Sequence, residues 1–196
     1  SWISDLGARR FIVREEATLQ LVEVGPAMIP QLIDGISNQN VEGTARSIFI
    51  LQRLASNNDL SIEAQARAAL EKLGQQDGSA LSRKATRALA VLDERREEKS
   101  ILALRALGAT IGSEYVVIGT EARPMMTARI DDQWTGTLED LQRLKWVRVI
   151  EHLALEGARV TDEWMPYVKR MEGLLSLELK RTRVTSQGTA QLKDHP

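Results

Sequence analysis

The chain of 196 residues contains no cysteine. This absence excludes disulfide bonds, thiolate nucleophiles and every zinc site that uses cysteine ligands. It does not indicate a compartment, because the cytosol and the cell envelope suit a cysteine-free protein equally well. Only two histidines are present, His152 and His195, and neither belongs to a His-Glu-x-x-His pair.

Aromatic residues are scarce, at 4% of the chain, whereas the hydrophobic fraction of 43% is ordinary for a folded protein. The core must therefore be built mainly from Leu, Ile, Val and Ala, which favours helices and repeat units over an aromatic-rich β-sandwich. With 26 basic and 27 acidic residues, the sequence lacks the cationic footprint that binds nucleic acid or anionic lipid. No apolar run reaches the roughly 18 residues needed for insertion into a membrane.

Catalytic motifs are missing as well, since the sequence has no Gly-x-Ser-x-Gly elbow and no glycine-rich phosphate loop. The densest acidic cluster is Asp131-Asp132 with Glu139-Asp140, which could bind a hard cation, but it lacks the ligand spacing and glycine of a calcium loop. The alternative interpretation is a turn followed by the acidic first turn of a helix. We predict no active site, no metal site and no cofactor.

Apolar residues in the first half of the chain recur at steps of three and four, the spacing of one helix face. These stripes predict helices over residues 13–24, 29–36, 41–55, 62–73 and 79–107. Gly25-Pro26 should separate the first two helices, and Ser61 is the expected N-cap of the fourth.

The last of these helices is predicted to be continuous, because no glycine or proline interrupts residues 80–107. We expect its end to pack Ile101, Leu104 and Leu107 against the first β unit of the second half. A helix of this length would be roughly 40 Å long at about 1.5 Å per residue.

Val13-Arg14-Glu15-Glu16-Ala17, followed by Leu21 and Gly25-Pro26-Ala27, resembles the short helix pairs of HEAT-like repeats in bacterial proteins. Small residues at the helix crossings would let such pairs stack closely, as at Ala45, Ala66 and Ala85. The resemblance implies a HEAT-like helical segment over residues 1–108.

The second half of the chain contains a repeat of 24 residues. The spacing Leu-x-x-Leu-x-Leu and the segment that follows it occur as Ile150, Leu153, Leu155 and Val160-Thr161-Asp162, then as Leu174, Leu177, Leu179 and Val184-Thr185-Ser186. This pattern resembles bacterial leucine-rich repeats of the Val-Thr-Asp type. It implies a leucine-rich-repeat segment over residues 109–196, in which each short strand precedes a helix.

Upstream the repeat degrades, with Met125, Ala128 and Ile130 on the same spacing after a shift of one residue. The β-rich segment 115–119 is interpreted as a strand of an atypical capping unit. The fold class is therefore α then α/β: a HEAT-like stack continues through a long helix into a short solenoid. We expect about four strands, parallel where the repeats are regular.

Strand residues between the inward leucines should face outward on the concave side, where solenoids commonly bind partners. The repeat alignment places them in three rows: Thr127, His152 and Ser176; Arg129, Ala154 and Glu178; and Asp131, Glu156 and Lys180. The alternative is a solvated strand face whose charges compensate one another. Trp164 is a further candidate for partner binding, since its counterpart one period later is Gly188, although tryptophan more often packs in a core.

We therefore expect a non-enzymatic protein-interaction or scaffold module of a larger bacterial protein, with a protein or peptide partner and no nucleic acid. The contact should be centred on Arg129, His152 and Glu178. The alternative is a regulatory or substrate-positioning segment of an enzyme whose catalytic domain lies outside this sequence.

Overall fold

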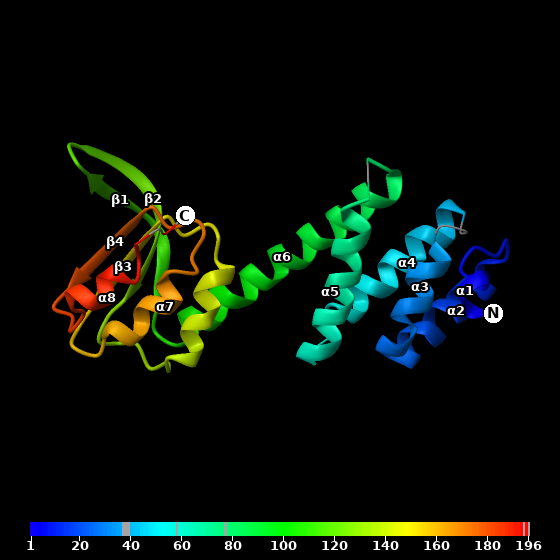
Figure 1. Ribbon diagram of the computed structural model, residues 1–196, viewed down its shortest axis with the longest axis horizontal. Coiled ribbons are helices and arrows are strands. Elements are labelled where there is room, and N and C mark those ends of the chain that lie inside the picture. Colours follow the sequence, from blue (N-terminus) through cyan, green and yellow to red (C-terminus); the bar gives the residue numbers. More distant parts are fainter. Residues whose placement is uncertain (37–39, 58, 77, 194, 196) are drawn as a thin grey trace. The chain divides into compact units, whose positions relative to one another are not determined.

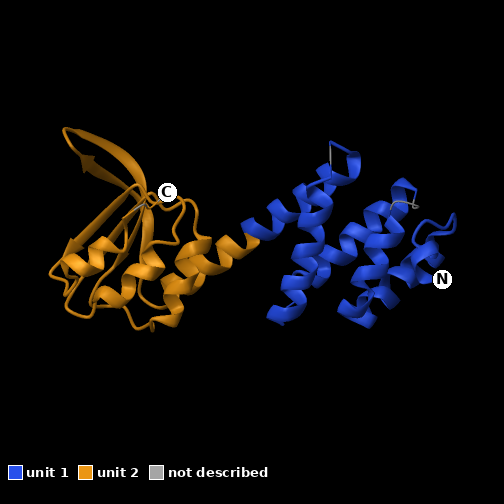
Figure 2. Cartoon of the chain, viewed as in Figure 1, with its two compact units in different colours: residues 1–94 blue, residues 95–196 orange. Residues whose placement is uncertain are grey.

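The computed structural model describes residues 1–36, 40–57, 59–76, 78–193 and 195. The chain divides into two compact units, residues 1–94 and 95–196, which Figure 2 shows in different colours. The division falls within one helix, α6 (Ala80–Ala106), and not after residue 108. It does so because the last turns of α6 contribute to the core of the second unit.

In the described residues of the first unit, the regular elements are all helices (Figure 1). They are α1 (Trp2–Asp5), α2 (Phe11–Val24), the 3-10 helix η1 (Gly25–Met28), α3 (Ile29–Ile36), α4 (Val41–Leu54), α5 (Leu60–Gly74) and the first part of α6. Gly25, at a φ of 76°, ends α2 in the left-handed region that glycine tolerates best. The apolar stripes meet in one core that includes Leu21, Leu32, Leu51 and Leu70. The predicted helices are therefore confirmed to within a few residues.

One detail of the first unit differs from the prediction. The N-cap of α5 is Asp59 and not Ser61, because α5 begins at Leu60 and the Asp59 carboxylate accepts hydrogen bonds from the first free backbone N–H groups. Phe49 lies in the most apolar stretch of α4 but is 51% exposed, whereas its neighbour Ile50 is fully buried.

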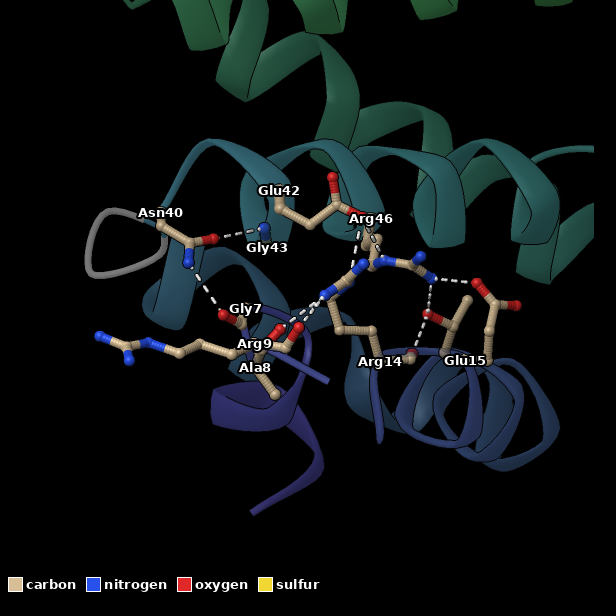
Figure 3. A network of polar contacts seen from close by, with 10 residues as sticks. Gly7, Ala8, Arg9, Arg14, Glu15, Asn40, Glu42, Gly43 and Arg46 are labelled. Atoms are coloured by element: carbon tan, nitrogen blue, oxygen red, sulfur yellow. Dashed lines mark hydrogen bonds and ion pairs between the residues drawn. The ribbon is translucent and has the colours of Figure 1, made fainter. Parts of the chain in front are cut away.

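Two arginines, Arg14 of α2 and Arg46 of α4, form ion pairs between these two helices (Figure 3). Arg14 donates to two carbonyl oxygens of the loop before α2, and its Nε lies 3.3 Å from Glu42 Oε1. Arg46 contacts Glu42 at 2.8 Å and Glu15 at 2.7 Å, and its hydrogen bond lowers the pKa of Glu42. Because both guanidinium groups already contact carboxylates, we assign this network to the packing of the first unit.

The second unit combines a sheet with short helices. After the end of α6 come β1 (Thr110–Ile118), β2 (Glu121–Ile130), η2 (Glu139–Trp146), β3 (His152–Glu156), η3 (Asp162–Trp164), α7 (Met165–Val168), β4 (Ser176–Lys180) and α8 (Ser186–Ala190). The sheet order is β1-β2-β3-β4, with β1 antiparallel to β2 and the other neighbours parallel. The predicted class, α then α/β, and the predicted four strands are confirmed.

One face of this sheet forms the core of the second unit. Leu153 and Leu155 of β3 are fully buried there, together with Leu141 of η2 and Met165 of α7. Leu104 of α6 is also fully buried in this core, and Ile101 and Leu107 pack partly buried against it. The predicted docking of the helix end is therefore confirmed.

The Val-Thr-Asp segment links one strand-helix unit to the next. Asp162 accepts hydrogen bonds from the backbone N and the Oγ1 of Thr185, at 2.7 and 2.6 Å. Both hydrogen bonds lower the pKa of Asp162, and the bond from the hydroxyl has the larger effect. A Cβ atom at Gly188 would overlap the Asp162 carboxylate, which explains why glycine stands one period after Trp164.

Candidate partner-binding face

The strand register brings the predicted rows together. Thr127 pairs with His152, and His152 with Ser176; Arg129 pairs with Ala154, and Ala154 with Glu178. Side chains of paired residues lie on one face of a parallel sheet, and this face is opposite to the core leucines. We call it the row face and define it by Thr127, Arg129, His152, Ala154, Glu156, Ser176, Glu178 and Lys180.

The third predicted row is incomplete. Glu156 pairs with Lys180, but β2 ends at Ile130, one residue before Asp131. Asp131 instead begins a turn, in which its Oδ1 accepts a hydrogen bond from the backbone N of Gln133 at 2.9 Å. The repeat alignment failed here because the segment around β2 is irregular and β2 ends before Asp131.

Exposure on the row face differs from the expectation that all these side chains are solvated. Thr127 is 1% and His152 is 5% exposed, so neither side chain offers a broad contact surface. Both residues lie on the central strands β2 and β3, where neighbouring strands cover them from both sides. The accessible part of the row face consists of the exposed Glu178 and Lys180 and the half-buried Arg129, Glu156 and Ser176.

Two of the four charged residues of the row face, Arg129 and Glu156, form ion pairs within the unit. Arg129 Nη2 lies 3.0 Å from Glu114 Oε2 of β1, and Arg181 pairs with Glu156. Arg181 has a φ of 54° and lies directly after β4. Lys180 makes no ion pair within the described part of the chain. The charges of the face are thus compensated in part, and Lys180 is an available cation.

His152 is the most constrained polar side chain of the row face. Its Nε2 lies 3.7 Å from Glu178 Oε2, which is longer than a hydrogen bond. Among the described residues, its buried Nδ1 has no hydrogen-bond partner. A buried polar atom without a partner costs free energy, typically about 1–3 kcal/mol.

Trp164 is buried, whereas a role in partner binding requires an exposed side chain. Only 7% of its surface is exposed, because η3 directs the side chain into the core of the second unit. The hypothesis that Trp164 is a surface anchor is therefore wrong. Trp134 is buried as well, and the ring of Trp146 carries Arg96 at 4.0 Å and Lys145 at 4.3 Å from its centre.

The acidic cluster is explained by local structure. Asp140 accepts hydrogen bonds from the backbone N and the Oγ1 of Thr137, both at 2.9 Å, and these lower its pKa. Asp131 accepts the hydrogen bond from the backbone N of Gln133 in the turn after β2. In the described ranges, no group of three or more His, Asp or Glu side chains could hold a metal ion. None of the described helices has the length and apolar character that crossing a membrane requires.

The sequence did not reveal the contribution of β1 to this surface. Glu114 reaches the row face because β1 pairs antiparallel with β2, in a register that sets it opposite Met125. The available signal was Gly119, which has a φ of 64° and begins the tight turn between the strands. A hairpin interpretation of that turn would have placed Glu114 opposite Met125, on the face of the sheet that carries Arg129.

No family model matches this chain, and no curated protein or solved structure matches it at a significant level.

Proposed function

We propose that this chain is a non-enzymatic protein-interaction module and that the row face binds a segment of a protein partner. The observation that carries the proposal is the set of accessible charges on the row face, the exposed Glu178 and Lys180 of β4 and the half-buried Arg129 of β2. This arrangement offers one anion and two cations across the sheet. Such a set suits a polar peptide segment that supplies charges of both signs.

An interaction role would follow from a repeat architecture, which we propose for both units. In this proposal the first unit is a short HEAT-like stack, and the second unit is a short leucine-rich-repeat solenoid with a capping hairpin. The parallel pairing of His152 with Ser176, 24 residues apart, supports the second assignment. Asp162 and Thr185, which link consecutive strand-helix units, support it too. Solenoids of both types commonly present binding surfaces along their repeats.

The proposal gives His152 no catalytic role. Thr127 is its neighbour across β2 and β3. The Thr127 hydroxyl donates to the carbonyl oxygen of Met125 at 3.3 Å, so its proton is not directed at the imidazole. An activated nucleophile would need a hydrogen bond to the base. Polar recognition therefore explains this pair of residues better than acyl transfer.

Site-specific photo-crosslinking tests the proposal. A photoreactive phenylalanine analogue is placed at Ser176 on the row face or, as a control, at Glu163, an exposed residue of η3. Irradiation in an extract of source cells should link a defined protein at Ser176 and not at Glu163. Identical products at both positions, or none at Ser176, would contradict a binding role for this face.

A further inference from the structure

A second surface of this unit, the outer edge of β1, is independent of the row face. β1 forms one edge of the sheet and spans nine residues, Thr110–Ile118, of which only Glu114 is charged. β2 pairs with β3 only at Thr127–Ile130, so the tip of the β1-β2 hairpin extends beyond the other strands (Figure 1). Proteins usually protect such edges with lysine, proline or a bulge. β1 contains no lysine and no proline.

The hairpin register shows which backbone groups of β1 face away from β2. Ile118 pairs with Glu121 across a two-residue turn, so both backbone groups of Ile118 point toward β2. Direction alternates along an antiparallel strand, and the N–H and C=O groups of Ser113, Tyr115 and Val117 therefore point outward. Ile111 follows the same rule, since Arg105 of α6 donates to its outward carbonyl oxygen at 2.7 Å.

The side chains at this edge are apolar and accessible. Tyr115 is 79% and Val117 is 69% exposed, and both lie on the same face of β1. Ile118, at 43%, adds exposed apolar surface at the tip. Within the described part of the chain, no hydrogen bond occupies the outward backbone groups of Ser113, Tyr115 and Val117. These groups and the exposed apolar side chains thus occur together, beyond the carbonyl that Arg105 occupies.

We propose that β1 pairs antiparallel with β1 of a second copy of this chain, with the twofold axis at Tyr115. In this register Tyr115 faces Tyr115 of the second copy, and Ser113 faces Val117. The three outward residues of each copy would form about six hydrogen bonds between the copies. Glu114 lies opposite Val116 of the second copy, so no like charges face each other.

The composition of the edge favours a second copy over a foreign strand. A register centred on Glu114 would place two carboxylates opposite each other, whereas the register centred on Tyr115 avoids this repulsion. That register also pairs every outward backbone group of residues 113–117 with the same segment of the other copy. The edge is therefore complementary to itself in charge and in hydrogen-bonding pattern.

Sedimentation velocity of the whole chain over a concentration series tests this pairing. The wild type should form a dimer whose fraction rises with concentration up to the millimolar range. Tyr115→Lys should weaken the dimer by roughly tenfold or more, because two cations would meet at the axis. Leu175→Lys is the matched control: it adds the same charge at an exposed apolar residue of the same unit outside β1, and should not weaken the dimer.

Val117→Pro provides a second test that preserves the hairpin. The N–H of Val117 points outward, so proline removes an intermolecular donor and no hydrogen bond to β2. The variant should keep the circular dichroism spectrum of the wild type and lose the dimer. A wild type that stays monomeric at millimolar concentration would overturn the proposal. A dimer that withstands both Tyr115→Lys and Val117→Pro would also overturn it.

Discussion

At the residue scale, the two regular strands differ in how deeply they bury equivalent leucines. Leu153 of the central strand β3 is fully buried, whereas its partner Leu177 on the edge strand β4 is only half-buried. We expect Leu153→Ala to lower the free energy of unfolding of the second unit by about 2–5 kcal/mol, through lost burial and a residual cavity. Leu177→Ala should cost less than Leu153→Ala. Urea unfolding measures both, with Ser176→Ala as a control of small effect, and equal losses at the two leucines would contradict the burial difference.

Asp162 makes a residue-scale contribution that depends on pH. Its pKa in the folded protein is lowered from 3.8 by the hydrogen bonds from Thr185. A lowered folded pKa stabilises the protein above the unfolded value, and the stabilisation is lost as the pH falls through the folded value. Asp162→Asn should therefore be less stable than the wild type at pH 7, and the difference should shrink below about pH 4.

Thermal unfolding at pH 7 and at pH 3 checks this expectation. Thr185→Val keeps a side chain of similar shape and removes the hydroxyl donor, so it should reproduce part of the loss. A difference between the wild type and Asp162→Asn that is the same at both pH values would show that the carboxylate charge is not involved.

At the element scale, α6 is continuous from Ala80 to Ala106, and its middle part carries trypsin sites at Arg95, Arg96 and Lys99. The Arg96 guanidinium stacks on the Trp146 ring at 4.0 Å, and Glu97 accepts a hydrogen bond from the backbone N of Val149 at 3.0 Å. Trypsin requires an extended, accessible backbone, so these sites should be cut slowly. Limited digestion followed by mass spectrometry tests this, with Lys193 near the chain end as an internal reference. Early cleavage within residues 95–99 would reveal a hinge in the helix.

Elements with regular patterns could be predicted from the sequence. The apolar stripes predicted α2, α4, α5 and α6, because packing on one side fixes the period of a helix. The 24-residue spacing predicted the pairing of β3 with β4, because each leucine position recurs at the same height in the next unit. Both predictions depend only on which residues must be buried together.

The irregular parts could not be predicted in this way. β1 belongs to no repeat, so the spacing gave no information on its antiparallel pairing or on the ion pair of Glu114 with Arg129. The alternation of apolar and polar residues along β3 correctly placed His152 on the face opposite the leucines. It did not predict the burial of His152, which depends on the strands at either side. Trp164 was a candidate because the residue 24 positions later is Gly188 and not another tryptophan. That glycine is explained by Asp162, whose carboxylate lies where a Cβ atom of residue 188 would be.

At the scale of the whole molecule, each of the two units has its own apolar core, and the formal net charge is only −1. Partner binding in the proposed function therefore depends on a local arrangement of charges and not on the overall charge. The proposed contact uses the accessible charged residues of the row face, Glu178, Lys180 and Arg129. Glu156 forms an ion pair with Arg181. The buried His152 is left unchanged in the test, because alanine there would also affect packing.

The affinity of the chain for a bound peptide tests the row face most directly. A peptide selected on the immobilised chain from a random displayed library serves as the ligand in calorimetric titrations. The variant with Arg129→Ala, Glu178→Ala and Lys180→Ala should keep the fold and bind roughly tenfold or more weakly. The control variant with Glu163→Ala, Arg170→Ala and Glu172→Ala changes three exposed residues outside the row face and should bind with unchanged affinity. Undiminished binding by the row-face variant, or an equal loss in the control, would contradict the assignment of partner binding to this face.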